Sequence, residues 1–380
     1  MSDFGADEFQ GRVQRLQSGM GDADIDALLL TTPPDVFYVT GFLTRFWESP
    51  ARPWFVVVPA SGDPIAVIPS IGADLMRKTW VSDIRCWIAP DLSDDGVTLL
   101  AGTLTEVVSG TGRLGLPMGH ETHLRMPLAD CARLKALMPN VTHVDATDIV
   151  RRVREVKSMA EIARIRAICG VADRAFDRVP EIARSGVGLD WVFRDFQVAL
   201  LQEGADWVPY LAGGAGPGGY GDVISPASAR PLVRGDVLML DTGAVLDGYF
   251  CDFDRNYAIG QADDATRRAY DVLFQATKAG LAAARPGATA ADLFHAMHRV
   301  IAQDGEAGRL GHGLGLSLTE WPSLIPTDHT VLREGMVLTL EPGLQIAPGR
   351  IMVHEENIVI RADGAELLSR RAPPELPVLE

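Results

Sequence analysis

Two aspartates on either side of a turn constrain the fold of this chain more than any other feature of its sequence. Asp241 ends an apolar run, and Asp252 follows the turn signal Asp247-Gly248. Such a turn joins neighbouring antiparallel strands. A hairpin centred between Leu246 and Asp247 places the two aspartates opposite each other, with Cβ atoms roughly 5 Å apart. Because two carboxylates at this distance repel each other, the sequence predicts a cation between them.

A second pair of acids repeats the pattern, and a histidine joins it. Glu341 and Glu355 end apolar runs on either side of Pro348, so a hairpin centred on Pro348 places the two glutamates opposite each other. His312 lies among the glycines of segment 311–315, where small neighbours let the imidazole ring approach a crowded centre. Four carboxylates and one imidazole suit Mn, Co, Fe or Zn.

The residues alone leave two questions about this site open. Asp254 competes with Asp252 as a ligand, because alternate residues of a strand share one face. Strands also often end in acids near turns, so each acid taken singly is equally consistent with an ordinary structural position. A register shift of one residue would separate the proposed pairs.

Four motifs follow one another in order between residues 241 and 357. They resemble the motifs of the pita-bread metallopeptidases, the family that includes prolidase, aminopeptidase P and the metal-free creatinase. The motifs are Asp241-Thr-Gly243 with Gly248-Tyr-Phe-Cys-Asp252, then Gly311-His312-Gly-Leu-Gly315, then Thr-Leu-Glu341-Pro-Gly343, and finally Glu355-Glu-Asn357.

The resemblance implies a role for each of the five residues. Asp241 would hold one metal ion, Asp252 and Glu355 would bridge two ions, and His312 and Glu341 would complete the other site. Glu341 would also be the catalytic residue that moves the proton. The resemblance favours Asp252 over Asp254, because the family's ligand follows a Gly-Tyr pair at this spacing. It implies two divalent ions as cofactors, with Mn favoured.

Several positions depart from the family's pattern and bear on the substrate pocket. Family peptidases carry histidines where this chain has Ile224 and Thr319, and aminopeptidase P has a further histidine at Gly308 and an arginine at Val353. We therefore expect a more apolar pocket, with Ile224, Thr319 and Tyr220 among its lining residues. The segment 214–219 matches a dinucleotide fingerprint but lacks the helix that this motif requires, so we expect a flexible loop near the pocket instead.

A change in the sequence pattern near residue 150 predicts a domain boundary there. Before it, short β-rich runs alternate with helical stretches, which predicts an α/β domain over residues 1–150. The segment 35–42 resembles one in the N-terminal domain of prolidase and creatinase. After this boundary, Ser158 and Glu161 form a capping box, and Met159, Ile162, Ile165 and Cys169 form the expected buried stripe of a helix. The resemblance implies an α+β pita-bread catalytic domain over residues 151–380.

The N-terminal domain suggests how a second subunit would take part. Relatives form dimers in which this domain covers the neighbouring site, so the resemblance implies a homodimer in which Arg45 and Trp47 reach the partner's pocket. A buried tryptophan beside a solvated arginine is the simpler explanation for these two residues.

Composition excludes several classes of partner. The net charge is −15 and the pI is about 5.0, which argues against nucleic acid and anionic membranes, since both require basic patches. The start of the chain lacks a secretory signal pattern, and no apolar run has the length of a membrane span. The four cysteines are scattered, as in a reduced cytoplasmic protein.

The leading hypothesis for function is a dinuclear metal-dependent hydrolase resembling Xaa-Pro dipeptidases and aminopeptidases. It would cleave an amide or peptide C–N bond of a dipeptide or another small substrate by means of metal-activated water. One alternative is a non-peptidase relative, either a metal-assisted lyase or an amidohydrolase, that acts on a small metabolite. The other alternative is a catalytically inactive binding homologue.

Overall fold

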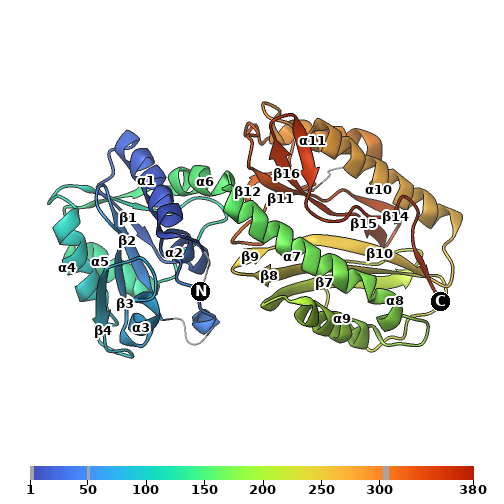
Figure 1. Ribbon diagram of the computed structural model, residues 1–380, viewed down its shortest axis with the longest axis horizontal. Coiled ribbons are helices and arrows are strands. Elements are labelled where there is room, and N and C mark those ends of the chain that lie inside the picture. Colours follow the sequence, from blue (N-terminus) through green and yellow to red (C-terminus); the bar gives the residue numbers. More distant parts are fainter. Residues whose placement is uncertain (1–3, 49–51, 303–307) are drawn as a thin grey trace. The chain divides into compact units, whose positions relative to one another are not determined.

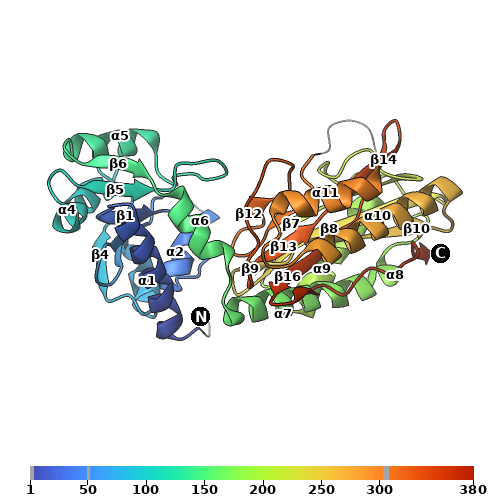
Figure 2. The same cartoon turned by 90° about the horizontal axis from the view of Figure 1, so that it is seen from above.

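The computed structural model describes residues 4–48, 52–302 and 308–380, which form two compact units that divide between Arg154 and Glu155 (Figures 1 and 2). Each unit has its own sheet system and its own core. None of the helices in these described segments has the length and apolar character that a bilayer crossing requires.

The first unit is built on one six-stranded mixed sheet in the order β4-β3-β2-β1-β5-β6. Strand β1 pairs antiparallel with β2 and parallel with β5. The elements are α1 (Ala6–Asp22), β1 (Ala27–Leu30), α2 (Pro33–Thr40), η1 (Phe46–Glu48), β2 (Phe55–Pro59), β3 (Ile65–Pro69), η2 (Ser70–Gly72), α3 (Ala73–Met76), β4 (Asp83–Trp87), α4 (Val97–Val107), β5 (Arg113–Leu116), α5 (Leu128–Leu137), β6 (Thr142–Asp145) and α6 (Thr147–Glu155).

One core cluster of the first unit lies between one face of this sheet and two helices. Leu29 and Val57 point from neighbouring strands toward Leu100 of α4 and Leu134 of α5, and all four side chains are buried. Successive side chains of a strand point to opposite faces, so one helical layer buries only every second residue of each strand. The predicted α/β class of this part of the chain is confirmed.

The second unit contains two larger sheets and one two-stranded ribbon. Strands β18-β10-β8-β7, with β9 beside β8, form one sheet; β12-β11-β13-β16-β17 form another; and β14 pairs with β15. The strands are β7 (Trp207–Pro217), β8 (Asp236–Leu246), β9 (Tyr249–Phe250), β10 (Phe253–Ile259), β11 (His312–Gly313), β12 (Glu320–Ser323), β13 (Val337–Leu340), β14 (Gly343–Ala347), β15 (Arg350–Val353), β16 (Glu356–Arg361), β17 (Gly364–Leu367) and β18 (Val378–Leu379).

Helices cover both sides of these sheets. Figure 1 shows α10 and α11 on one side and α7 and α9 on the other. The helices are α7 (Met159–Asp177), α8 (Val179–Ile182), α9 (Leu189–Glu203), α10 (Asp264–Ala283) and α11 (Ala290–Ile301). The sheets therefore form an inner layer, and side chains that point between them are shielded from water by helices.

Helix α7 begins as predicted but buries a slightly different stripe. Ser158 caps it, because its hydroxyl accepts a hydrogen bond from the Glu161 backbone while the Glu161 carboxylate accepts one from the Ser158 backbone. Ile162 and Cys169 are buried, as is Ile165, but Met159 is 68% exposed, so its predicted burial is wrong. A side chain at the first helical position leans back beyond the N-terminal end of the helix, past the surface on which the later turns pack.

The first predicted hairpin forms, but its register differs from the prediction. Asp247 and Gly248 both have positive φ, 52° and 87°, and so occupy the two central positions of the turn. The ladder therefore pairs Asp241 with Asp254. Asp252 lies between β9 and β10, on the same face as Asp241 but diagonal to it.

The second hairpin has the predicted register. Leu340 pairs with Glu356 at the end of the β13–β16 ladder, and Gly343 pairs with Val353 at the start of the β14–β15 ladder. These two pairs share one register, which sets Glu341 opposite Glu355 in the gap between the ladders, as predicted. The register shifts only at the turn itself, where a bulge between Gln345 and Ala347 pairs Ala347 with Arg350. Neither glutamate belongs to a ladder pair, so both side chains lie where regular pairing is interrupted.

The glycine-rich segment is not the flexible loop that we expected. Residues 214–217 form the last part of β7 and pair with residues 236–239 of β8, and residues 218 and 219 form the turn that follows. A Cβ atom at Gly216 would lie 2.6 Å from the carbonyl oxygen of Gly219. Gly216 therefore lets the chain turn back closely on itself at the end of β7.

We expect Ser158→Ala to lower the free energy of unfolding by about 1 kcal/mol, because the first turn of α7 loses an acceptor for one of its free N–H groups. Urea unfolding followed by circular dichroism would measure the loss. Ser158→Thr keeps a hydroxyl acceptor and is the control. An unchanged transition midpoint in Ser158→Ala would show that the cap contributes nothing to stability.

Candidate metal centre

Five segments of the second unit bring their acidic and imidazole side chains to one place. Asp241 comes from β8, Asp252 from the link between β9 and β10, His312 from β11, Glu341 from the end of β13, and Glu355 from the start of β16. Their ligand atoms form two groups, Asp252–His312–Glu341 and Asp241–Asp252–Glu355, with the atoms of each group within 4.8 Å of one another. Asp252 belongs to both groups.

The histidine ring is oriented by its own backbone. Nδ1 of His312 lies 2.8 Å from the carbonyl oxygen of Gly313, so Nδ1 carries a hydrogen and donates it. Nε2 then faces the acids, 2.8 Å from Oε1 of Glu341 and 3.2 Å from Oδ2 of Asp252. Burial by itself lowers the pKa of His312, but the charges of Glu341 and Asp252 outweigh it and raise the pKa to about 10.

The second group consists of carboxyl groups alone. Burial raises the pKa of Asp241 and of Glu355 well above the ordinary range, and repulsion from the neighbouring carboxylates raises both further. Burial also raises the pKa of Asp252, to about 6. Oδ1 of Asp241 is buried without a hydrogen-bond partner among the described residues. A buried acceptor of this kind is costly unless a cation or another donor satisfies it, so the donor set fits divalent metal ions.

Glu341 has the opposite electrostatic character. Burial raises its pKa, but the nearby His312 and a short hydrogen bond from the Thr339 hydroxyl together lower the pKa overall. Its side chain is 15% exposed, more than that of Asp252 or His312. Glu341 is therefore an ionised carboxylate at the more open edge of the group.

The structure distinguishes Asp252 from Asp254, which the residues alone did not. Both carboxylate oxygens of Asp254 already have donors: Oδ1 accepts from the Glu355 backbone at 2.6 Å, and Oδ2 accepts from the Asn256 amide at 2.8 Å. Asp254 belongs to neither ligand group. It accepts the hydrogen bond of the Glu355 backbone, and of the two aspartates Asp252 is the one in the candidate ligand groups.

Two residues that sequence reasoning missed act on this centre. Tyr210 on β7 forms a hydrogen bond with Asp241, and burial followed by the charge of Asp241 raises the pKa of its phenol. The charge of Arg309 lowers the pKa of both Asp252 and Glu341. Recognising segment 207–217 as a strand beside β8 would have pointed to Tyr210, whereas no local pattern singles out Arg309.

The residues expected to line a substrate pocket lie in different surroundings. Ile224 is 82% exposed, and Thr319 is half-buried. Tyr220 is buried, and its hydroxyl is already engaged, donating to Asn256 at 3.2 Å and accepting from the Val353 backbone at 2.6 Å. Their substrate roles remain predictions.

Arg45 and Trp47 belong to the first unit. Arg45 is exposed, and the Trp47 ring packs against Trp54, with ring centroids 5.5 Å apart, and beneath the guanidinium of Arg125. The reach of Arg45 and Trp47 into a partner's pocket remains a prediction.

His354 points away from the acids, as strand alternation predicts. Its ring packs edge-on against Tyr270 and Phe274 of α10. Both ring nitrogens are buried without a hydrogen-bond partner in the described segments. Burial lowers the pKa of His354 to about 4, so the ring is neutral.

Comparison with known proteins places the two units in described families. The model of the Creatinase/Prolidase N-terminal domain matches residues 12–156, and the model of metallopeptidase family M24 matches residues 163–362. The probable dipeptidase PepE of Mycobacterium tuberculosis is 30% identical over 383 residues, covering 99% of this chain and 98% of that protein. The Xaa-Pro dipeptidase of Pyrococcus horikoshii is 27% identical, covering 94% and 97%.

Solved structures agree with these matches. The dipeptidase PepE from Mycobacterium ulcerans superposes with a TM-score of 0.86 at 28% identity, covering 100% of both chains. The prolidase from Pyrococcus horikoshii superposes with a TM-score of 0.82 at 24% identity, covering 95% of this chain and 99% of that one, and shows the shared fold. The expected family resemblance and the expected fold class, creatinase-like α/β followed by pita-bread α+β, are both confirmed.

We expect Asp241→Asn to stabilise the metal-free protein, because the buried Asp241 carboxyl must take up a proton or carry an unfavourable charge without metal, and an amide needs neither. In the wild type, added Mn²⁺ should raise the thermal midpoint, and the variant should gain much less. Thermal unfolding with a chelator and then with Mn²⁺ measures both effects, with the exposed Glu334→Gln as control. A variant that is less stable without metal, yet gains as much from Mn²⁺ as the wild type, would contradict the electrostatic account.

We expect His354→Phe to weaken the loss of stability in acid. The folded pKa of His354, about 4, lies below its ordinary value of 6.5. Its contribution is therefore complete above pH 6.5 and is lost as the pH falls towards 4, because the unfolded chain takes up the proton first. The effect should reach about 2 kcal/mol near pH 5. Urea unfolding of metal-free protein at pH 7 and pH 5, with His120→Phe at an exposed position as control, tests the difference.

Proposed function

We propose that this protein, which belongs to metallopeptidase family M24, is a dipeptidase that hydrolyses Xaa-Pro dipeptides at a centre of two divalent metal ions. The single observation that carries the proposal is the pair of ligand groups that share Asp252. The names of the relatives, probable dipeptidase and Xaa-Pro dipeptidase, support the substrate class. The proposed ligands are Asp241, Asp252, His312, Glu341 and Glu355.

Membership of the family makes the chain a metal-dependent hydrolase. The two alternatives, a non-peptidase relative and an inactive binding homologue, are not favoured by relatives named as dipeptidases across nearly the whole chain. A binding protein without catalysis would also have no use for a buried cluster of acids, which costs folding stability when it is not neutralised.

The two groups suggest how the ions are shared. Asp241 and Glu355 would hold one ion, His312 and Glu341 the other, and Asp252 would contact both. Bridging by Glu355, which the family resemblance implies, is part of the proposal, although Glu355 belongs to only one group. When bound, two divalent ions supply Lewis-acid activation of a water molecule and of the scissile carbonyl group.

The chain's own residues supply proton transfer and orientation. A carboxylate oxygen of Glu341 would accept a proton from the attacking water and pass it to the leaving amine, because His312 and Thr339 keep this carboxylate ionised. The bond from Nδ1 of His312 to the Gly313 carbonyl would keep Nε2 directed at the centre.

Substrate handling would differ from the pattern that family peptidases use. Ile224, Thr319, Gly308 and Val353 occupy places where those relatives carry basic side chains. The pocket would therefore recognise the substrate through apolar contacts and the metal centre more than through charged side chains. Xaa-Pro dipeptides are therefore the first substrates to test, because the proline ring is apolar.

Three finer assignments complete the proposal. The metal would be manganese, since a set of four carboxylates and one imidazole has no thiolate to favour softer ions. The protein would act as a homodimer in the cytoplasm, where its four free cysteines would stay reduced. Arg45 and Trp47 would then reach the substrate pocket of the partner subunit.

We expect the Mn²⁺-loaded protein to release proline from a pool of Xaa-Pro dipeptides, and Glu355→Ala to lose both the metal and the release. The loss should be about 100-fold or more, since even the removal of residues that support ligands costs up to that factor. Amino-acid analysis of the products measures proline, and Glu334→Ala, at an exposed position, is the control.

Two other results would change the assignment. Full proline release by a Glu355→Ala variant that has lost its metal would contradict the metal mechanism. A wild-type protein that binds two ions and releases no proline would retain the metal centre but exclude this substrate class.

A further inference from the structure

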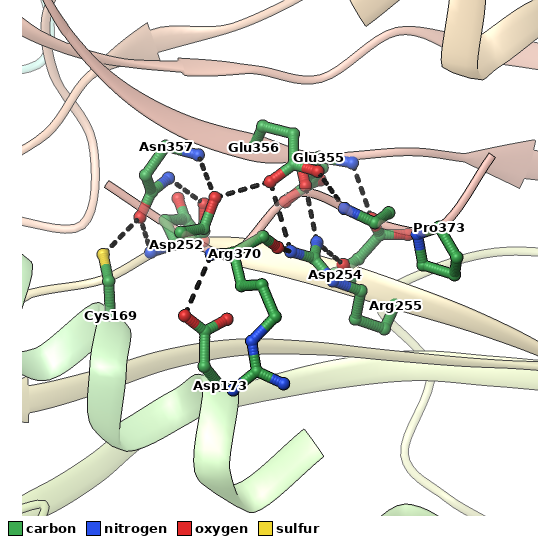
Figure 3. A network of polar contacts seen from close by, with 12 residues as sticks. Cys169, Asp173, Asp252, Asp254, Arg255, Glu355, Glu356, Asn357, Arg370 and Pro373 are labelled. Carbon is green, nitrogen blue, oxygen red and sulfur yellow. Dashed lines mark hydrogen bonds and ion pairs between the residues drawn. The ribbon is translucent and has the colours of Figure 1, made fainter. Parts of the chain in front are cut away.

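Asp252 is held in place by a side chain rather than by a neighbouring strand. It lies in the link between β9 and β10. Its backbone N–H donates to Oδ1 of Asn357 at 2.9 Å, and its backbone carbonyl accepts a short hydrogen bond from Nδ2 of the same residue. The amide of Asn357 thus pairs with Asp252 as the backbone of a neighbouring strand would (Figure 3).

Asn357 is itself held firmly. It lies on β16 opposite Thr339, and it is fully buried. Its backbone N–H donates to the Ser369 hydroxyl at 3.1 Å, and its carbonyl accepts from the Leu368 backbone at 2.8 Å. The side-chain amide therefore projects from a fixed point in the sheet toward Asp252.

A buried thiol completes the arrangement. Sγ of Cys169, on α7, lies 3.4 Å from Oδ1 of Asn357 and donates to it (Figure 3). Burial raises the pKa of Cys169, so the thiol keeps the hydrogen that it donates. If the amide turned over, its NH₂ group would face two donors, the Asp252 N–H and the Cys169 thiol, and its oxygen would face the Asp252 carbonyl. All three contacts therefore favour one orientation of the amide.

We propose that Asn357 and Cys169 are positioning residues of the metal centre, which together fix the backbone of the one acid that belongs to both ligand groups. The inference rests on the proposed function, because it takes Asp252 as a metal ligand. A carboxylate on a displaced backbone would leave both groups at once, and residues that orient ligands strongly affect metal affinity. Asn357 contacts neither substrate nor metal in this proposal and acts through Asp252.

The decisive variant is Asn357→Asp, which keeps the size of the side chain. It replaces the NH₂ donor with an oxygen that would face the Asp252 carbonyl. We expect Mn²⁺ to bind about 10- to 100-fold more weakly than to the wild type. Calorimetric titration of metal-free protein with MnCl₂ measures the number of ions and their affinity, and the visible spectrum with Co²⁺ reports the ligand geometry independently of activity.

Cys169 is tested by a matched pair with a control. Cys169→Ala should weaken Mn²⁺ binding by several-fold, up to about tenfold, the scale of one lost hydrogen bond. Cys169→Ser retains a donor and should restore most of the affinity. Cys251→Ala removes an equally buried thiol beside Asp252, which donates to the Thr242 and Ala244 carbonyl oxygens at 3.7 Å and not to Asn357, so it should bind Mn²⁺ like the wild type.

The outcomes separate this inference from the proposed function. A wild-type protein that takes up no Mn²⁺ contradicts the proposed function, and the inference falls with it. If the wild type binds two ions and Asn357→Asp binds them equally well, only the inference is overturned. If Cys169→Ala and Cys251→Ala bind Mn²⁺ with equal affinity, Cys169 serves packing alone, even if its substitution lowers thermal stability. That result would overturn the positioning role of Cys169. If Asn357→Asp does not fold, the Mn²⁺ affinities of the three cysteine variants still test whether the Cys169–Asn357 contact positions Asp252.

Discussion

Repulsion among buried carboxylates is the constraint on which the rest of the second unit depends. Asp241, Asp252 and Glu355 lie within reach of a single ion, and burial raises the pKa of each. Water cannot screen charges that helices on both sides of the sheets enclose. A fold that gathers such groups is stable only if cations, donors or protons offset the charge, and a divalent ion offsets the most charge in the least space.

Much of the surrounding structure serves to hold these acids against their mutual repulsion. Asp254 accepts the Glu355 N–H, and Asn357 pairs with the backbone of Asp252. Figure 3 shows that Arg255 joins the same network: its guanidinium donates to the Glu355 carbonyl and pairs with Glu356. A network of hydrogen-bonded polar side chains between β10 and β16 therefore supports the backbone of the candidate ligands.

Each wrong prediction from the sequence has an identifiable physical cause. The second hairpin sets Glu341 opposite Glu355 as predicted, although a bulge between Gln345 and Ala347 shifts the register at the turn itself. The first hairpin was misplaced by one position at its turn, because Asp247 and Gly248 both take the positive φ values of a two-residue turn. Met159 was assigned to a buried stripe because periodicity does not show that a side chain at the first helical position leans back beyond the packed surface. Segment 214–219 was taken for a loop because glycine patterns look alike in loops and in strands that end in a close turn.

The sequence by itself determined which residue types would meet: two pairs of acids on either side of turns, a histidine among glycines, and a change of pattern near residue 150 after an α/β part. Local chemistry is sufficient for these features, because turn signals and apolar periodicity act over a few residues. Only the tertiary structure decided that Asp254 bonds to the Glu355 backbone while Asp252 belongs to both candidate ligand groups, and that Tyr210 and the Asn357–Cys169 pair contact two of these acids. Those relations join residues as far apart as Cys169 and Asn357, and no local pattern encodes contacts that arise only when separate elements pack together.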